Sequence, residues 1–233
     1  MKNTLTLLYK LIAYNVKVIF ANRFIYFVLA AFLFFGFIIT ITIFDDPNFS
    51  EAVIFGFLVF PGLLLIFYPM AYVIQNDDDS KMLETIFGIP NYRYKVSLVR
   101  FFITILVAFC ILYVLGHIAN LTLFRFNILP MLGQVLFPVT FLASIGFMLA
   151  TVTKSGNGTA ISMVIIGFIF LIFSEELEHT QWNVFLNPFD NPRGMSEYVW
   201  LNIIFKNRIY LSVGTALCLL YGLFKLQFRE KFI

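Results

Sequence analysis

Residues 75–97 read QNDDDSKMLETIFGIPNYRYKVS, a polar stretch with a long apolar run on each side. The chain as a whole is 61% hydrophobic and only 12% charged, whereas a soluble domain carries about 25% charged residues. This composition predicts an integral membrane protein. A loop this polar then lies where the chain meets water or a partner protein. The net charge of +3 is too small to indicate a nucleic-acid partner.

Apolar runs on both sides of this stretch have the length of membrane spans, since a spanning helix needs about 20 mainly apolar residues. The six runs are Phe24–Phe44, Ala52–Ile74, Leu98–Leu121, Met131–Val152, Thr159–Phe173 and Ile209–Leu226. No segment is both long and polar enough for a separate soluble domain. The sequence therefore predicts one transmembrane domain over residues 1–233, an all-α bundle of six spans.

The segment before the first span, residues 3–22, has apolar residues at helical spacing, and Lys10 and Lys17 recur on another side. Such a pattern predicts an amphipathic helix that lies in the membrane interface with its lysines toward lipid phosphates. The alternative is a continuation of the first span, which Lys17, Asn22 and Arg23 disfavour.

The distribution of lysine and arginine predicts the orientation, because these residues concentrate in cytoplasmic loops. With a cytoplasmic N-terminus and six spans, both termini and residues 75–97 lie inside. Of the 16 lysines and arginines, those left outside are only Arg125, Arg193, Lys206 and Arg208. We therefore expect a multi-pass protein with both termini in the cytoplasm.

The largest predicted outer segment is residues 175–208. Within it, Tyr198–Phe205 is half apolar and too short to span, which leaves open a re-entrant or an interfacial helix. A cluster near its start has the spacing for two metal ligands on one helical face, or is a hydrated loop: Glu175, Glu176, Glu178 and His179. On the inner side, the sequence TKSGNG from Thr153 predicts a tight hairpin turn between the fourth and fifth spans.

A short helix is predicted inside the polar stretch, over Lys81–Phe87. Asp77–Asp79 place negative charge before its start, where helix N–H groups favour it, and Asp79 or Ser80 can cap it. Gly88 suits the position after its end, and Pro90 prevents its continuation. Half of this helix is apolar and faces water, which indicates a partner protein.

Residues Leu83–Arg100, LETIFGIPNYRYKVSLVR, resemble the cytoplasmic loop of ABC-2 type transporter permeases. The chain keeps the Leu83–Glu84 pair, Pro90, Arg93 and the following basic residues. It departs from the family by having Ser80, Lys81 and Met82 where Gly-Thr is frequent. The predicted topology is similar too, with an N-terminal interfacial helix, six spans and Asn-Pro in a long outer loop.

The resemblance implies a permease subunit in the inner membrane of a bacterium, surrounded by lipids and paired with itself or a similar chain. The short helix would be a coupling helix that sits in a cleft of a separate cytosolic ATPase. The implied coupling residues are Asp79, Ser80, Lys81, Met82, Leu83, Glu84, Ile86, Phe87, Pro90 and Arg93. The chain has no G-x-x-x-x-G-K-[ST] sequence, so ATP and Mg²⁺ are expected on the partner, and this chain is expected to be a non-catalytic subunit. The resemblance implies an exporter. An apolar interior suits an amphipathic substrate.

A second interpretation uses the same acids. Asn76–Asp79 resembles the N-D-x-x-D motif with which membrane prenyltransferases hold Mg²⁺, for which carboxylates are suitable ligands. That motif needs an acid at position 80, where this chain has Ser80, and a second acidic cluster on the same side. A solvated acidic loop without a partner is the third possibility.

Hydroxyl residues deep in the spans could face a substrate path or bond back to their own helices. They are Thr40, Thr42, Thr140, Ser144 and Ser162.

Overall fold

The structure, a computed structural model, describes residues 24–45, 50–79 and 92–226. In this part helices are the only regular secondary structure and no strand is present, as the sequence predicts. The predicted interfacial helix over residues 3–22 and the coupling helix over residues 81–87 lie outside the described residues. Side chains of residues 45, 77–79, 92 and 93 are likewise outside the description.

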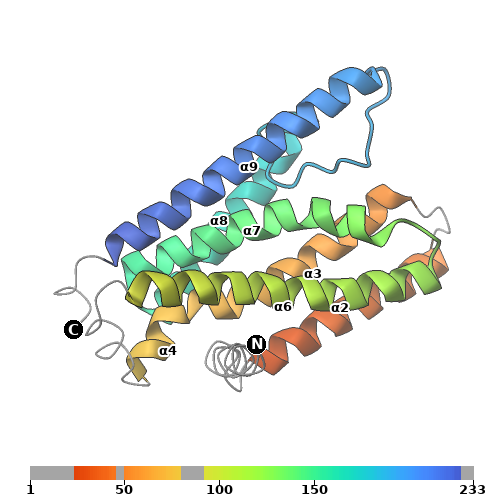
Figure 1. Cartoon of the computed structure of the whole chain (residues 1–233). Coiled ribbons are helices and arrows are strands. Elements are labelled where there is room, and N and C mark those ends of the chain that lie inside the picture. Colours follow the sequence, from red (N-terminus) through yellow and green to blue (C-terminus); the bar gives the residue numbers. More distant parts are fainter. Residues whose placement is uncertain (1–23, 46–49, 80–91, 227–233) are drawn as a thin grey trace, which may run out of the picture.

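Six long helices match the six predicted spans, and a short one follows the second (Figure 1). Their bounds are α2 (Phe24–Asp45), α3 (Glu51–Ala71), α4 (Val73–Asp79), α6 (Tyr92–Thr122), α7 (Ile128–Thr153), α8 (Gly156–Glu176) and α9 (Glu197–Lys225). All six long helices are long and apolar enough to cross a membrane. The prediction of a helical chain with six helices long and apolar enough to span a membrane is confirmed.

Helices α3 and α7 form the centre of the bundle. Of the most apolar stretch of each, 61% of the residues are buried, against 17% in α2 and α9 and 11% in α8. Gly62 lets the two central helices approach closely, because a Cβ at this position would lie 2.7 Å from the Val139 side chain. Helices α2, α6, α8 and α9 surround this pair and expose apolar side chains to the membrane.

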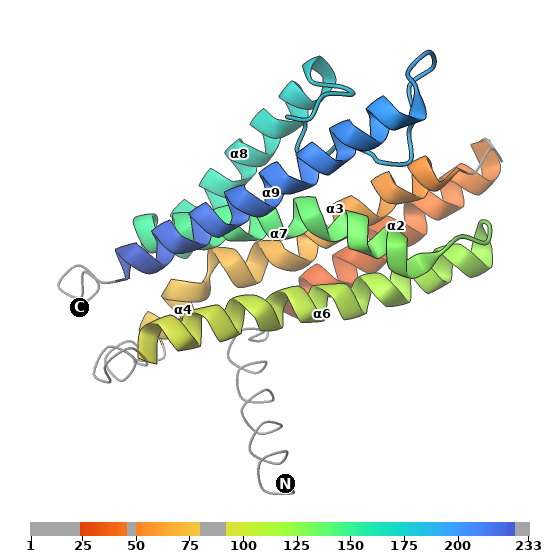
Figure 2. The same cartoon turned by 45° about the horizontal axis from the view of Figure 1, so that its top comes forward.

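The long helices run back and forth, so their connections gather at two ends (Figure 2). One end holds the α3–α4 junction, the start of α6, the α7–α8 turn and the end of α9. The distribution of lysine and arginine predicts that this end faces the cytoplasm, and it is called the inner end below. The other, outer end holds the α2–α3, α6–α7 and α8–α9 connections.

The hydroxyls predicted either to line a path or to bond within their helices do the latter. Each donates to a carbonyl one turn earlier in its own helix, as with Thr40 to Gly36 at 2.7 Å and Ser144 to Phe141 at 2.7 Å. Thr42, Thr140 and Ser162 behave in the same way. The cause is the absence of water in the membrane, which leaves the helix's own carbonyls as the nearest acceptors.

Three boundaries differ from the sequence expectations. Residues Tyr198–Phe205 belong to α9, which begins at Glu197, so they are neither re-entrant nor a separate helix. The outer connection is therefore residues 177–196, shorter at both ends than expected, and α8 is longer than the fifth run. Helix α4 was not predicted from the sequence. Asp77–Asp79, which were expected to precede a helix, are the last residues of α4.

Candidate functional site

The structure describes the two flanks of the predicted coupling segment. Asp79 is the last residue of α4 and Arg93 lies in the first turn of α6. The other predicted coupling residues, in the range 80–90, lie outside the described residues. Both flanks are at the inner end (Figure 1). Arg100, one of the basic residues that carry the family resemblance, is buried on α6.

Helix α3 breaks at Tyr72, and this break directs α4. The backbone of Tyr72 has φ −104° and ψ 7°, outside the helical range, although the Tyr72 N–H still donates to the Tyr68 carbonyl at 3.1 Å. The chain resumes a helix at once, with Asn76 N–H donating to the Tyr72 carbonyl at 2.9 Å. Pro69 lies just before the break and cannot donate a helical hydrogen bond of its own. The polar segment therefore begins on the short helix α4, which starts directly after the break at Tyr72.

Two hydrogen bonds join this junction to the start of α8. The Tyr72 hydroxyl donates to Asn157 Oδ1 at 2.8 Å, and the Gly156 N–H donates to Gln75 Oε1 at 2.7 Å. The second bond satisfies one of the free N–H groups that every helix has at its N-terminus. A Cβ at position 156 would overlap the Tyr72 ring, so only glycine allows this approach. We call these four residues the inner clamp.

Helix α8 is anchored at its inner end. Its only buried residues are Gly156 and Thr159, and Thr159 shares a 2.6 Å hydroxyl–hydroxyl hydrogen bond with Thr153 of α7. The turn before α8 is as tight as the sequence predicts: Lys154 takes a left-handed backbone with φ 57°, and Ser155 caps α8. The remainder of α8 stands beside α3 and α7 without burying a residue.

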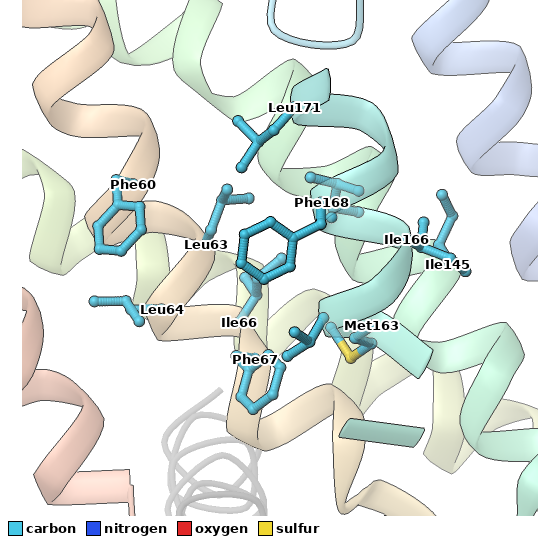
Figure 3. Close-up of a pocket in the computed structure, with 13 residues that line it drawn as sticks. Phe60, Leu63, Leu64, Ile66, Phe67, Ile145, Met163, Ile166, Phe168 and Leu171 are labelled. Atoms are coloured by element: carbon cyan, nitrogen blue, oxygen red, sulfur yellow. The ribbon is translucent and has the colours of Figure 1, made fainter. Parts of the chain in front are cut away.

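An apolar groove of about 210 Å³ lies between α3 and α8, with α7 as its floor (Figure 3). In the close-up, Phe60, Leu64 and Phe67 extend from α3 and Phe168 and Met163 from α8. No polar side chain lines it. Phe60 and Phe168 are exposed toward the membrane. The groove is therefore a hydrocarbon-like space that opens sideways, and it is called the lateral groove below.

The outer connection is held by buried amides and one buried arginine. Arg208 of α9 donates from Nε to Gln134 Oε1 on α7 at 2.8 Å and from Nη1 to Asn207 Oδ1 at 2.7 Å. Its Nη2 donates to the Leu186 carbonyl at 3.3 Å, and its guanidinium lies over the Phe137 ring. These contacts join the connection to α7 and α9.

The asparagines extend this network. Asn207 Nδ2 donates to the Gln181 and Asn183 carbonyls at 2.9 and 2.8 Å, and Asn187 Nδ2 donates to the Ala52 carbonyl of α3 at 2.8 Å. The connection therefore reaches α3 as well. We call Gln134, Asn183, Asn187, Asn207 and Arg208 the outer network. Sequence reasoning missed it, because Arg208 was assigned to a loop; Gln134, a polar residue inside an apolar run, was the available signal.

A polar pocket of about 240 Å³ lies between the outer end of α8, the connection and the start of α9. Its charged side chains are Glu175, Glu178 and Asp190, and the rings of His179 and Trp200 lie edge to face, 5.9 Å apart. Among the described residues, no three histidines, cysteines or acids are grouped closely enough to hold a metal ion. Glu175, Glu178 and His179 of the predicted cluster line this pocket. We call the whole polar pocket the outer pocket.

In comparisons with family models, with curated proteins and with solved structures, nothing matches this chain.

Proposed function

We propose that this chain is the membrane-spanning permease subunit of an ATP-driven transporter of the ABC-2 type. A separate cytosolic ATPase would bind the polar segment around Lys81–Phe87. The observation that supports this best is the inner clamp. It connects the helix that leads into the polar segment with α8, a wall of the lateral groove. A force applied to the polar segment would thus reach a membrane helix.

The inner clamp combines two hydrogen bonds with one close side-chain contact. Each hydrogen bond contributes roughly 1 kcal/mol, and the close packing of Gly156 against Tyr72 adds a contact that excludes any larger residue. Since α8 buries residues only near this end, a tilt of α4 would be followed by α8 with little loss of packing elsewhere. ATP binding on the partner would then bias two arrangements of the same helices.

The lateral groove supports an amphipathic substrate. A free ion would find no polar side chain there, whereas the apolar part of an amphipathic molecule would replace membrane lipid at little cost. The substrate is therefore amphipathic and enters from the membrane. Export is the direction that the resemblance to ABC-2 permeases implies.

Co-purification tests the proposal. The full chain, tagged and extracted in mild detergent, should bring down an ATPase in equal amounts. Leu83→Asp and Ile86→Asp place a charge on the apolar side of the predicted coupling helix and should abolish this association. Thr85→Asp, with the same charge on the polar side, is the matched control and should retain it. An ATPase that stays bound to both apolar-face variants would contradict the proposal, as would the absence of any ATPase from the unaltered chain.

The acids preceding that helix provide a second control. Asp77→Asn and Asp78→Asn would destroy a Mg²⁺ site of the prenyltransferase kind but should leave ATPase binding largely intact. Retained association with these variants therefore separates a docking segment from a metal-dependent enzyme.

A further inference from the structure

The lateral groove lies at the depth of the hydrocarbon core. On α8 its lining runs from Met163 to Leu171, seven residues after the start of the helix and five before its end. At 1.5 Å per residue this places it about 8–10 Å from either end of the helix. Hydrocarbon is therefore what surrounds its opening.

The size of the lateral groove fits one chain. An engineered apolar cavity of roughly 150 Å³ holds one benzene molecule, and the groove encloses about 210 Å³. A helix of a second protein, about 10 Å across with its side chains, is too wide to enter. A single flexible hydrocarbon chain is narrow enough to enter.

The outer pocket lies on the same face of α8 as the lateral groove. Met163, Gly167 and Leu171 line the groove, and Ser174, in the last turn of α8, lines the pocket. Steps of four, four and three residues keep these positions on one side of a helix. From Leu171 to Ser174 the axial rise is about 4.5 Å. A molecule lying along this face would pass directly from an apolar space into a polar one.

The polar space favours a cation. Three carboxylates line the outer pocket, those of Glu175, Glu178 and Asp190, and no lysine or arginine is among its lining residues. The rings of His179 and Trp200 complete it, and an indole face attracts ammonium groups. A lipid headgroup with a net negative charge would meet repulsion instead.

We propose that the lateral groove and the outer pocket form one binding site for an amphipathic cation, a molecule with a single long apolar chain and an amine or quaternary ammonium head. The chain lies between α3 and α8, and the head lies among the three carboxylates. The site deepens the proposed function by giving its substrate class, and it rests on that function only for the step of transport. Binding itself needs no ATPase.

The test uses the full chain in lipid nanodiscs and two probes of equal length. One is hexadecylamine with a photoactivatable diazirine at mid-chain, and the other is the hexadecanoic acid with the same group. After illumination, labelled residues are mapped by mass spectrometry. The amine probe should label the α3 and α8 residues of the groove about tenfold more than the exposed residues of α2, as expected for an ion-paired head. The acid probe should label both surfaces alike.

Two sets of variants locate the chain and the head. Gly167 faces open space within the groove, so Gly167→Trp should fill it and remove the groove labelling. Gly36→Trp is the matched control, since Gly36 also faces open space, on α2, and labelling should persist. A triple change of Glu175→Gln, Glu178→Gln and Asp190→Asn should remove the preference for the amine by about tenfold. Equal unfolding temperatures for all variants would establish that each is folded.

Equal labelling of the groove and of α2 by the amine probe would overturn the proposal, and so would groove labelling that survives Gly167→Trp. Amine preference that survives loss of the three carboxylates would overturn the assignment of the head. A chain that binds the amine but no ATPase would contradict the proposed function alone. A chain that binds the ATPase but not the amine would contradict only this inference.

Discussion

The two ends of α8 are held in different ways. At the inner end, a two-residue turn and the inner clamp fix the helix through backbone groups and a glycine contact. At the outer end, a connection of twenty residues separates α8 from α9, and the side chains of the outer network hold this connection to α3, α7 and α9. The inner end therefore behaves as a hinge with little freedom. The outer connection, residues 177–196, is called the cover. It contacts the last turns of α8 through backbone bonds and through the bond from Asn183 Nδ2 to the Ser174 carbonyl.

The largest expected effect of a single change is in the outer network. Asn207→Leu removes two donations to carbonyls and leaves the Arg208 guanidinium, buried in the same network, without one acceptor. Because unsatisfied buried groups are costly, the free energy of unfolding should fall by about 3 kcal/mol. Denaturant titration in detergent measures this, and faster protease cleavage at Arg193 would report the loosened cover.

Asn202→Leu on the exposed side of the same helix is the control, and its unfolding should shift by less than about 0.5 kcal/mol. Equal losses for the two leucine variants would mean that the outer network does not hold the cover.

A smaller effect is expected at the inner clamp. Gly156→Ala places a methyl group against the Tyr72 ring and should lower the free energy of unfolding by about 2 kcal/mol, the usual cost of overpacking. Two residues further, a Cβ at Gly158 would meet its nearest atom at 3.7 Å. Gly158→Ala should therefore be neutral or stabilising, since alanine favours a helix. Thermal unfolding of the two alanine variants measures this difference. Equal melting temperatures would mean that the inner clamp shifts to accommodate the added methyl group.

The inner turn was predictable because its cause is local. The glycines and small polar residues around Lys154 indicate a turn whatever the rest of the chain does. The six spans were predictable for a similar reason, since an apolar run of the right length has few alternatives in a membrane. Even Pro61 and Pro138 lie within helices without ending them.

The outer network was not predictable, because it depends on contacts across long sequence separations. The Arg208–Gln134 bond joins residues 74 positions apart, and Asn187–Ala52 joins residues 135 apart. A charge count that treats every arginine as a loop residue assigned Arg208 to water, whereas packing places it between α9 and α7. The inner clamp was missed likewise, because Gln75 was assigned to the polar stretch 75–97 and Gly156 to the turn that follows Thr153.

One bond of the inner clamp can be isolated by a single substitution. Tyr72→Phe removes the hydroxyl that donates to Asn157 and leaves the ring contacts unchanged. A double-mutant cycle with Asn157→Ala should give a coupling of about 1 kcal/mol, as for one hydrogen bond near water. Tyr113→Phe on α6 is the control. A coupling near zero would show that the glycine contact, not the hydroxyl, makes the clamp.

The smallest effect is expected at the serine caps of α8 and α3, which depend on local contacts alone. Ser155 caps α8 at the inner end and Ser50 caps α3 at the outer end, each accepting an N–H hydrogen bond at 3.4 Å. Ser155→Ala and Ser50→Ala should each cost about 0.5 kcal/mol, the low end for a lost cap, because both bonds are long. Equal shifts in unfolding would assign the contrast between the ends to the inner clamp and the outer network alone. A markedly larger loss at Ser155 would instead mean that local capping contributes to the hinge.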